Sequence, residues 1–372
     1  MMKNINGYEI ISLFEQFSPK VYAMEGDKIG LQVGDLSKPV KRVMIALDVL
    51  DEVVEEAISQ KVDLIIAHHP PIFRSLSKIT MDNPSGKIMH KLIKHDISVY
   101  AAHTNLDVAK GGVNDLLSAA LGLQETQVLV PTYEDKLKKL VVYVPTDQAE
   151  QVKKAIGDAG AGAIGNYSHC VFSTEGIGEF QPLEGADPYI GTVNKLEHVE
   201  EVKIESIYAA SKEKKIIRAM LKAHPYEEVA YDIYDLQIRG EQLGLGRIGK
   251  VKETTLREFA NHVKKVFEVD GVRVVGNLEA KVKKVAVLGG DGNKYYSHAL
   301  MKGADVYITG DMYYHVAHDA QAEGLNIIDP GHNVEKVMKI GVTKVLTKMC
   351  KDNGYEVEIF PSVIHTDPFT FI

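Results

Sequence analysis

The stretch 63-DLIIAHHPPIF-73 places two histidines and two prolines directly after four apolar residues. The run Leu64–Ala67 has the length and composition of a strand buried inside a sheet. Successive side chains at a strand end point to opposite sides, so His68 and His69 cannot both be core residues of one face. The alternatives are an accidental loop or two imidazoles presented at the end of a sheet strand.

Short apolar runs alternate with amphipathic stretches around this segment. We predict buried strands at 42–49, 63–69 and 97–104, and helices at 51–60, 85–96 and 111–123. Strands that alternate with helices predict a mostly parallel sheet that helices cover on both faces.

The pattern changes in the middle of the chain and later resumes. Strands at 139–145, 168–180, 200–210 and 228–238, with helices at 148–160 and 212–224, give the order βαββαβ of a ferredoxin-like domain. The α/β pattern returns at 245-LGRIGKV-251. We therefore predict one α/β domain in two parts, 1–128 and 244–372, interrupted by an inserted α+β domain at 129–243.

The two outer parts resemble each other at a constant spacing. KRVMIALD (41–48) matches KKVAVLGG (283–290), and DLIIAHH (63–69) matches DVYITGD (305–311), both with a shift of 242 residues. A third pair, 97–107 against 325–335, has a shift of 228. The two shifts differ by about the length of the segment 73–86, which only the first part contains. We infer two related half-domains around a pseudo-twofold axis.

Imidazoles and carboxylates gather at three predicted strand ends. Open α/β sheets bind ligands at the carboxyl ends of their strands. A donor set of this kind, without thiols, suits zinc, manganese or iron, and it exceeds what one tetrahedral ion requires. We therefore favour two metal ions bridged by a carboxylate. The six candidate donors are His68, His69, His103, Asp107, His332 and Glu335.

Each of these residues also has a structural interpretation. A single histidine at a strand end is usually structural, but the adjacent pair and the repeat of a carboxylate at matching positions in both halves favour metal binding. His103 is either a third imidazole ligand or a group that orients a carboxylate or water. Asp311 occupies the place that matches His69. The glycines of GGDG (289–292) form either a phosphate cradle or, as we favour, a tight turn.

Composition excludes some function classes. The 372 residues favour two domains, and a net charge of −8 argues against nucleic-acid coating or binding to an anionic membrane. The first residues lack the apolar core of a signal peptide, and no apolar run approaches ~18 residues. Cys170 and Cys350 are the only cysteines and form no CxxC pair, which fits a reducing cytoplasm and excludes a thiolate zinc finger.

Five separated motifs then give a family resemblance. In chain order they are DKIGLQVGD, AHHPPIF, AAHTNLD, GHNVE and HTDPF. Together they resemble the GTP cyclohydrolase 1 type 2 homologues, a family also called Ngg-interacting-factor-three-like. The middle of the chain resembles the PII/CutA-like insert of the longer bacterial members.

The resemblance implies a two-metal site and an assembly. The family motifs place the ligands at His68, His69, Asp107, His332 and Glu335, with Glu335 as the bridge. Members are expected to form homohexamers whose metal sites face an internal cavity. The early motif reads Asp27-Lys28 here, where many members have Asp-Asn. The family name implies opening of the imidazole ring of GTP, but no purine pocket is specified by the sequence.

Two hypotheses of function follow. The first is a metal-dependent hydrolase with two divalent ions per chain, zinc being favoured and manganese or iron compatible, that acts on a small nucleotide-like or phosphorylated substrate. His103 or Asp311 would carry the proton. The second is a non-catalytic regulatory or metal-handling protein that uses the PII/CutA-like insert for sensing or partner binding.

Overall fold

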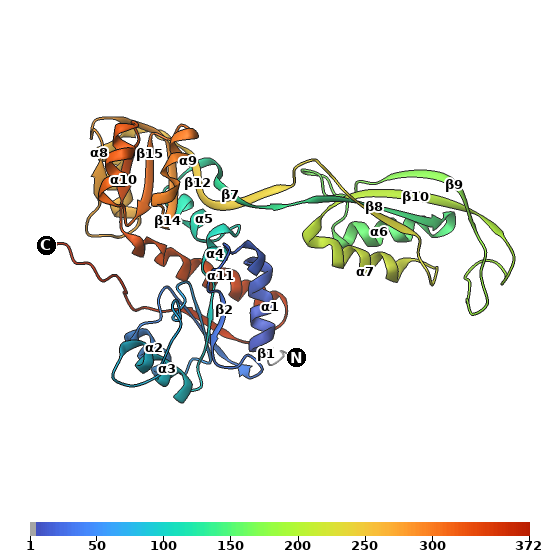
Figure 1. Ribbon diagram of the computed structural model, residues 1–372, viewed down its shortest axis with the longest axis horizontal. Helices are drawn as coiled ribbons and strands as arrows, with labels where there is room; N and C mark the ends of the chain where they lie inside the picture. The colour runs from blue at the N-terminus through green and yellow to red at the C-terminus, as the bar shows by residue number, and fades with distance from the viewer. Residues whose placement is uncertain (1–4) are drawn as a thin grey trace. The chain divides into compact units, whose positions relative to one another are not determined.

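A computed structural model of the chain describes residues 5–372 and divides it into two compact units (Figure 1). Unit 1 consists of the residues up to Tyr133 together with Leu243–Ile372, and unit 2 is Glu134–Gln242. Strand β7 (Gln124–Asp135) runs without interruption through the place where we had set the first boundary. The division therefore falls near the end of a strand.

The first sheet of unit 1 carries the histidine pair. Its strands, in spatial order, are β17 (Glu358–Pro361), β4 (Arg42–Ala46), β5 (Leu64–Ala67), β6 (Ser98–Ala101) and β2 (Gly30–Val33). The four strands β17, β4, β5 and β6 are parallel, whereas β2 is antiparallel to β6. A two-stranded ladder joins β1 (Ile5–Asn6) to β3 (Pro39–Val40).

The second sheet of unit 1 has six strands. In spatial order they are β13 (Arg273–Val275), β16 (Asn326–Asp329), β15 (Val306–Gly310), β14 (Lys281–Asp291), β12 (Glu241–Thr255) and β7. Strands β14, β15 and β16 are parallel to one another. The carboxyl ends of four neighbouring parallel strands are thus available in the first sheet and those of three in the second.

Alternation along the strands sends side chains to different cores. In β4, Val43 and Ile45 belong to the core that both sheets share, and Met44 and Ala46 face the opposite side. The shared core includes residues of α1 (Gly7–Phe17), α5 (Val113–Ala120), α8 (Leu256–Val266) and α11 (Val337–Asp352). Outer faces are covered by α2 (Asp51–Ser59) and α3 (Pro84–Lys94) on the first sheet, and by α9 (Tyr296–Met301) and α10 (Tyr314–Ala322) on the second.

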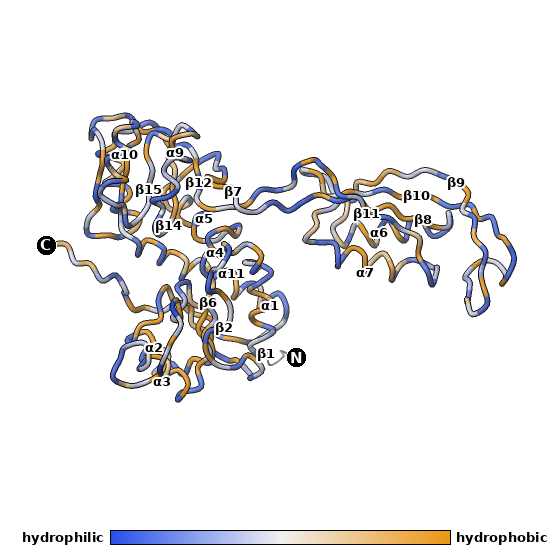
Figure 2. Tube along the Cα trace, viewed as in Figure 1, coloured by the Kyte–Doolittle hydropathy of each residue, from blue (hydrophilic) through white to orange (hydrophobic). Residues whose placement is uncertain are grey.

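Unit 2 has one antiparallel sheet with two helices. The strands, in spatial order, are β11 (Tyr231–Asp235), β8 (Leu137–Pro145), β10 (Glu197–Ala209) and β9 (Phe172–Phe180). The helices α6 (Ala149–Ala159) and α7 (Glu213–Ala223) bury their apolar residues in one core with β8 and β10. Figure 2 shows hydrophobic and hydrophilic residues alternating along α7, as a helix on a sheet requires.

The chain is thus a mixed α/β fold with several sheets, and at this level the prediction is confirmed. Among the described residues, no helix is long and apolar enough to cross a membrane.

Candidate metal centre

The carboxyl ends of two neighbouring parallel strands of the first sheet, β5 and β6, supply four of the six predicted donors. His68 and His69 directly follow β5, which lies between β4 and β6. His103 follows β6, and Asp107 lies in the short helix α4 (Thr104–Val108). His68 and Asp107 are buried, whereas His69 and His103 are half-buried. Residues that follow different strands come together here because the carboxyl ends of parallel strands lie at one edge of the sheet.

The second sheet supplies the remaining donors after β16. His332 and Glu335 lie in the 3₁₀ turn η5 (His332–Lys336), directly before α11. Side chains three residues apart in a 3₁₀ turn lie one above the other, and His332 Nε2 is 3.2 Å from Glu335 Oε2. Glu335 is almost fully buried.

All six predicted donors come together in one cluster. Glu335 Oε2 lies 3.6 Å from His68 Nε2 and 3.1 Å from His69 Nε2. His68 Nε2 is also 3.6 Å from Asp107 Oδ1. Three overlapping triads have donor atoms within 4.8 Å of one another: His68, His69 and His103; His69, His332 and Glu335; His68, Asp107 and Glu335.

Each of the four imidazoles uses its Nδ1 atom for a hydrogen bond that points away from the cluster. The acceptors are the Ala102 carbonyl for His68 (2.9 Å), Asp48 for His69 (2.6 Å), Asp27 for His103 (2.9 Å) and Asp311 for His332 (2.7 Å). An Nδ1–H bond of this kind orients the ring so that Nε2 faces the cluster, where it can bind a metal ion once it has released its proton. This is the usual arrangement of metal-binding histidines in proteins.

Two further observations fit a metal ion. His68 Nε2 and Asp107 Oδ1 are buried without a hydrogen-bond partner among the described residues, a costly state unless a cation is bound. Glycines also border the cluster. A Cβ atom on Gly289 would lie 2.9 Å from Glu335 Oε1, and one on Gly290 would lie 2.8 Å from the same atom. Side chains are thus excluded from the space beside Glu335.

Protons compete with a cation for the donor atoms of the cluster. Burial alone would lower the pKa of His69, but its hydrogen bonds to Asp48 and Glu335 raise that pKa to about 10. Burial would also lower the pKa of His332, but the hydrogen bond to Glu335 raises that pKa to about 9. Burial would raise the pKa of Glu335, but the surrounding imidazoles, His68 foremost, hold it well below its ordinary value. Metal binding must therefore displace protons.

Asp107 behaves differently from Glu335. Burial raises the pKa of its carboxyl above the ordinary value, in spite of the nearby imidazoles. Its Oδ1 atom accepts no hydrogen bond from the described residues, whereas Glu335 Oε2 lies near three imidazole nitrogens. A divalent cation beside Asp107 would compensate the charge that burial penalises.

The cluster lines a cleft of about 520 Å³ in unit 1. Apolar side chains, among them Phe73, Leu245 and Tyr295, form part of its wall. The GGDG segment also borders it, but two of its amides are already occupied: Gly289 N–H donates to Asn114, and Gly292 N–H donates to Thr309 Oγ1. These bonds favour the tight turn over the phosphate cradle.

Three carboxylates orient the imidazoles. From the sequence, Asp311 is a candidate proton carrier, whereas Asp27 and Asp48 have no predicted role. Asp48 follows β4, and its position at a strand end beside β5 was the available signal. Asp27 lies in the DKIGLQVGD motif, one residue before Lys28, the position at which this chain departs from many family members. Asp311 adopts a left-handed φ of 55°, an unusual conformation for a residue with a side chain, while it accepts the His332 bond.

Fold and cluster define a class: a mixed α/β protein with a candidate metal site of histidines and carboxylates between the strand ends of two sheets. Comparison with known proteins agrees. The pattern of the Duf34/NIF3 (NGG1p interacting factor 3) family matches residues 5–368, and the chain belongs to this family.

Relatives and solved structures match over the whole chain. The GTP cyclohydrolase 1 type 2 homolog of Bacillus subtilis strain 168 is 63% identical over 373 residues, with 100% of both chains covered. A Bacillus cereus protein related to NIF3 has a crystal structure with a TM-score of 0.96 and 62% identity, also over 100% of both chains. A Staphylococcus aureus protein gives a TM-score of 0.78 and 33% identity with the same coverage. The family predicted from the five motifs is therefore confirmed.

Proposed function

We propose that the cluster binds two divalent metal ions and that the protein is a metal-dependent hydrolase of a small nucleotide-like or phosphorylated substrate. One observation carries the proposal. Four imidazoles are fixed by outward Nδ1 bonds, and Nε2 atoms of three of them lie within 3.6 Å of the single oxygen Glu335 Oε2. An oxygen shared by several donors is the arrangement expected of a bridging carboxylate.

The proposed ligands are His68, His69, Asp107, His332 and Glu335, with Glu335 as the bridge. Nitrogen and oxygen donors without thiolate favour zinc and also accept manganese or iron. When bound, such ions supply Lewis acidity and lower the pKa of water towards ~7. Asp48 and Asp311 keep the His69 and His332 rings in place.

His103 is the proposed proton carrier. Burial opposes its charged form, yet the hydrogen bond to Asp27 raises its pKa above the ordinary value. The Asp27 carboxylate also accepts bonds from the amide and hydroxyl of Thr104, so the pair is held in a fixed orientation. Positioned acid–base groups typically contribute ~10²–10⁴-fold to a rate. The variant His103→Gln should therefore lose turnover at about that level while its metal content stays unchanged.

Metal analysis of the purified protein tests the site directly. We expect about two ions per chain, and loss of metal and turnover together in His69→Ala and Glu335→Ala. The matched control is His198→Ala, which removes an exposed imidazole of unit 2 that bonds only to Glu179 among the described residues. A folded protein without metal, or turnover of the true substrate by metal-free protein, would contradict the proposal.

A substrate screen separates hydrolysis from the regulatory alternative. Metal-replete protein is incubated with a panel of nucleotides and phosphoesters, and both binding and product are measured. Turnover that disappears on chelation and returns with added metal supports the hydrolase. Stoichiometric binding without product across the panel would instead support a regulatory or metal-handling protein.

We also propose that the two sheets of unit 1 are related half-domains. Asp63 Oδ2 accepts hydrogen bonds from the amides of Lys41 and Arg42, and Asp305 Oδ2 accepts them from Lys283 and Lys284. Every one of these residues is shifted by the predicted 242. The register agrees as well, because β4 pairs with β5 as β14 pairs with β15, at the same shift.

Unit 2 is proposed to be the ferredoxin-like, PII/CutA-like insert. Its strand order, β11-β8-β10-β9, with one helix after the first strand and one after the third, supports this assignment. The family resemblance further supports a homohexamer in the cytoplasm, with nucleic acid disfavoured as a partner by the net charge of −8. The mass of the assembly in solution, measured by light scattering, tests the hexamer.

A further inference from the structure

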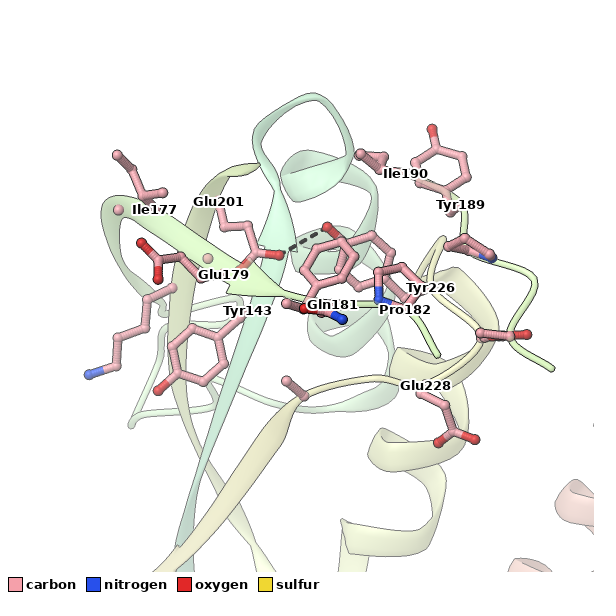
Figure 3. A pocket seen from close by; sticks show the side chains of 18 of the residues that line it. Tyr143, Ile177, Glu179, Gln181, Pro182, Tyr189, Ile190, Glu201, Tyr226 and Glu228 are labelled. Atoms are coloured by element: carbon pink, nitrogen blue, oxygen red, sulfur yellow. Dashed lines mark hydrogen bonds between the residues drawn. The ribbon is translucent and has the colours of Figure 1, made fainter. Parts of the chain in front are cut away.

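Unit 2 contains a cavity of about 750 Å³ that the metal centre does not involve (Figure 3). Its walls come from β8, residues 174–180 of β9, residues 201 and 203 of β10, the loop 181–190 and the segment 226–230. The loop is tied back to this segment by the amide of Asp187, which donates to Glu227 Oε1 at 3.0 Å. A volume of this size accommodates a small molecule.

A buried carboxylate lies inside the cavity. Glu201 is only 9% exposed, and its Oε1 accepts a hydrogen bond from the Tyr226 hydroxyl at 3.0 Å, the dashed line in Figure 3. Among residues 5–372 the structure gives Glu201 no cationic partner. Lys203 also lines the cavity, but its Nζ lies 3.5 Å from Glu205. No positively charged side chain among the described residues pairs with this buried carboxylate, so a cationic group of a ligand would compensate its lost hydration.

Glycine in β9 makes room for this carboxylate. A Cβ atom at Gly178 would lie 2.2 Å from Glu201 Oε2, a distance that no side chain at this position tolerates without displacing the carboxylate. Gly176 also lines the cavity, and a Cβ atom there would meet nothing within 4 Å. The strand sequence EGIGEF thus leaves both the carboxylate and the space next to it open.

Aromatic rings surround the same point. The Tyr226 ring lies with its centroid 5.7 Å from that of Phe180 and 6.3 Å from that of Tyr189. Figure 3 shows Tyr189 and Ile190 on the loop that faces Tyr226. Aromatic faces attract organic cations, most strongly where water is excluded. Aromatic rings around a carboxylate are therefore complementary to a positively charged group on an apolar body.

The charge of the lining selects against anions. Five glutamates and one lysine contribute to it; the glutamates are Glu175, Glu179, Glu201, Glu227 and Glu228. A phosphate or carboxylate ligand would be repelled by this set.

We propose that the cavity of unit 2 binds a small organic cation, an ammonium group on an aromatic or apolar body, with the ammonium at Glu201 and the body between Phe180, Tyr189 and Tyr226. The proposal is independent of the metal centre, so either can fail without the other. A free small molecule is the occupant that the volume and the loop over the cavity favour.

Three indole compounds with the same ring and different charges test this inference. Tryptamine is cationic, tryptophol is neutral and indole-3-propionate is anionic. The chain contains no tryptophan, so the indole fluorescence of each probe reports its own binding to the full-length protein. We expect tryptamine to bind about tenfold more tightly than tryptophol, the contribution of one charge-assisted contact, and indole-3-propionate to bind least.

Variants assign the preference to Glu201. The variant Glu201→Gln keeps the shape of the side chain and an oxygen for Tyr226. In this variant the affinity for tryptamine should fall to that for tryptophol, and the affinity for tryptophol should be unchanged. Tyr189→Ala should weaken both probes. The matched control is Glu184→Gln, which removes an exposed carboxylate of the same loop that does not line the cavity. It should leave the tenfold ratio intact.

Several results would overturn the inference. These are equal binding of the three probes, binding of none of them by the wild-type protein, or an unchanged tryptamine preference in Glu201→Gln. A change in assembly mass in Glu201→Gln, without any tryptamine binding by the wild type, would instead assign the cavity to a second copy of the chain.

Discussion

Replacing Asp48 by asparagine tests the arrangement that distinguishes this cluster from a chance group of polar residues. Asp48 Oδ1 accepts the Nδ1–H bond of His69 at 2.6 Å, and Asp48 also accepts a bond from the Thr366 hydroxyl. Groups that orient a metal-binding histidine typically contribute about 10–100-fold to metal affinity, or about 1.4–2.7 kcal/mol. Both side chains are 24% exposed, so water compensates part of the loss, and we expect a value near tenfold.

A second consequence follows from the protonation of the imidazoles. The Asp48 bond helps to raise the pKa of His69 to about 10, so its removal also weakens the competition of protons with the metal. The loss of apparent affinity in Asp48→Asn should therefore be smaller at neutral pH than at a pH near 10.

Competition with a chromogenic chelator at both pH values measures these affinities. Thr366→Val, which removes the hydroxyl that donates to Asp48 and accepts a long hydrogen bond from Asn333, should have a smaller effect. Asp352→Asn, which removes a surface carboxylate that pairs with Lys348, should have none. The reasoning is refuted if Asp48→Asn binds metal as tightly as the wild type at both pH values while the wild type is metal-loaded.

Three further predictions concern other parts of the molecule. Gly289→Ala places a Cβ atom 2.9 Å from Glu335 Oε1, and we expect at least a tenfold loss of metal affinity by the same competition assay, which an unchanged value would contradict. Arg247→Met leaves Asp115 without its buried partner and should lower the free energy of unfolding in urea by about 3 kcal/mol; a change below about 1 kcal/mol would show that the pair is dispensable. Burial lowers the pKa of His224 below 6.5, so the folded state takes up its proton later than the unfolded state. Stability should therefore be full above about pH 6.5 and decrease as the pH falls, and His224→Gln should remove that part of the decrease in thermal unfolding.

Much of the fold was predictable because local composition and local structure agree. The run Leu64–Ala67 is apolar throughout and becomes β5, which is buried between two parallel neighbours. The helix predicted at 51–60 becomes α2 and begins at Asp51, where two acidic residues suit the positive end of the helix dipole. The family, too, followed from motifs that are contiguous in the sequence.

The donors were predictable for a similar reason. His68, His69 and Asp107 each follow a strand, and parallel topology brings strand ends to one edge. His332 and Glu335 were predicted from the internal repeat, in which Glu335 aligns with Asp107. Distances between the donors, in contrast, depend on how the two sheets pack, and no spacing along the chain contains that information.

The sequence by itself determined which residues form the candidate cluster and which elements present them, because residue type and periodicity act over a few neighbouring positions. Tertiary structure alone decided that Asp27, Asp48 and Asp311 hold the imidazole rings, and that Glu201 lies buried in an aromatic cavity with Tyr226. The direction of a side chain and its access to water are set by packing partners that lie far away in the chain. The His68–His69 pair shows both sides: its place at a strand end follows from the sequence, and its partners follow from the fold.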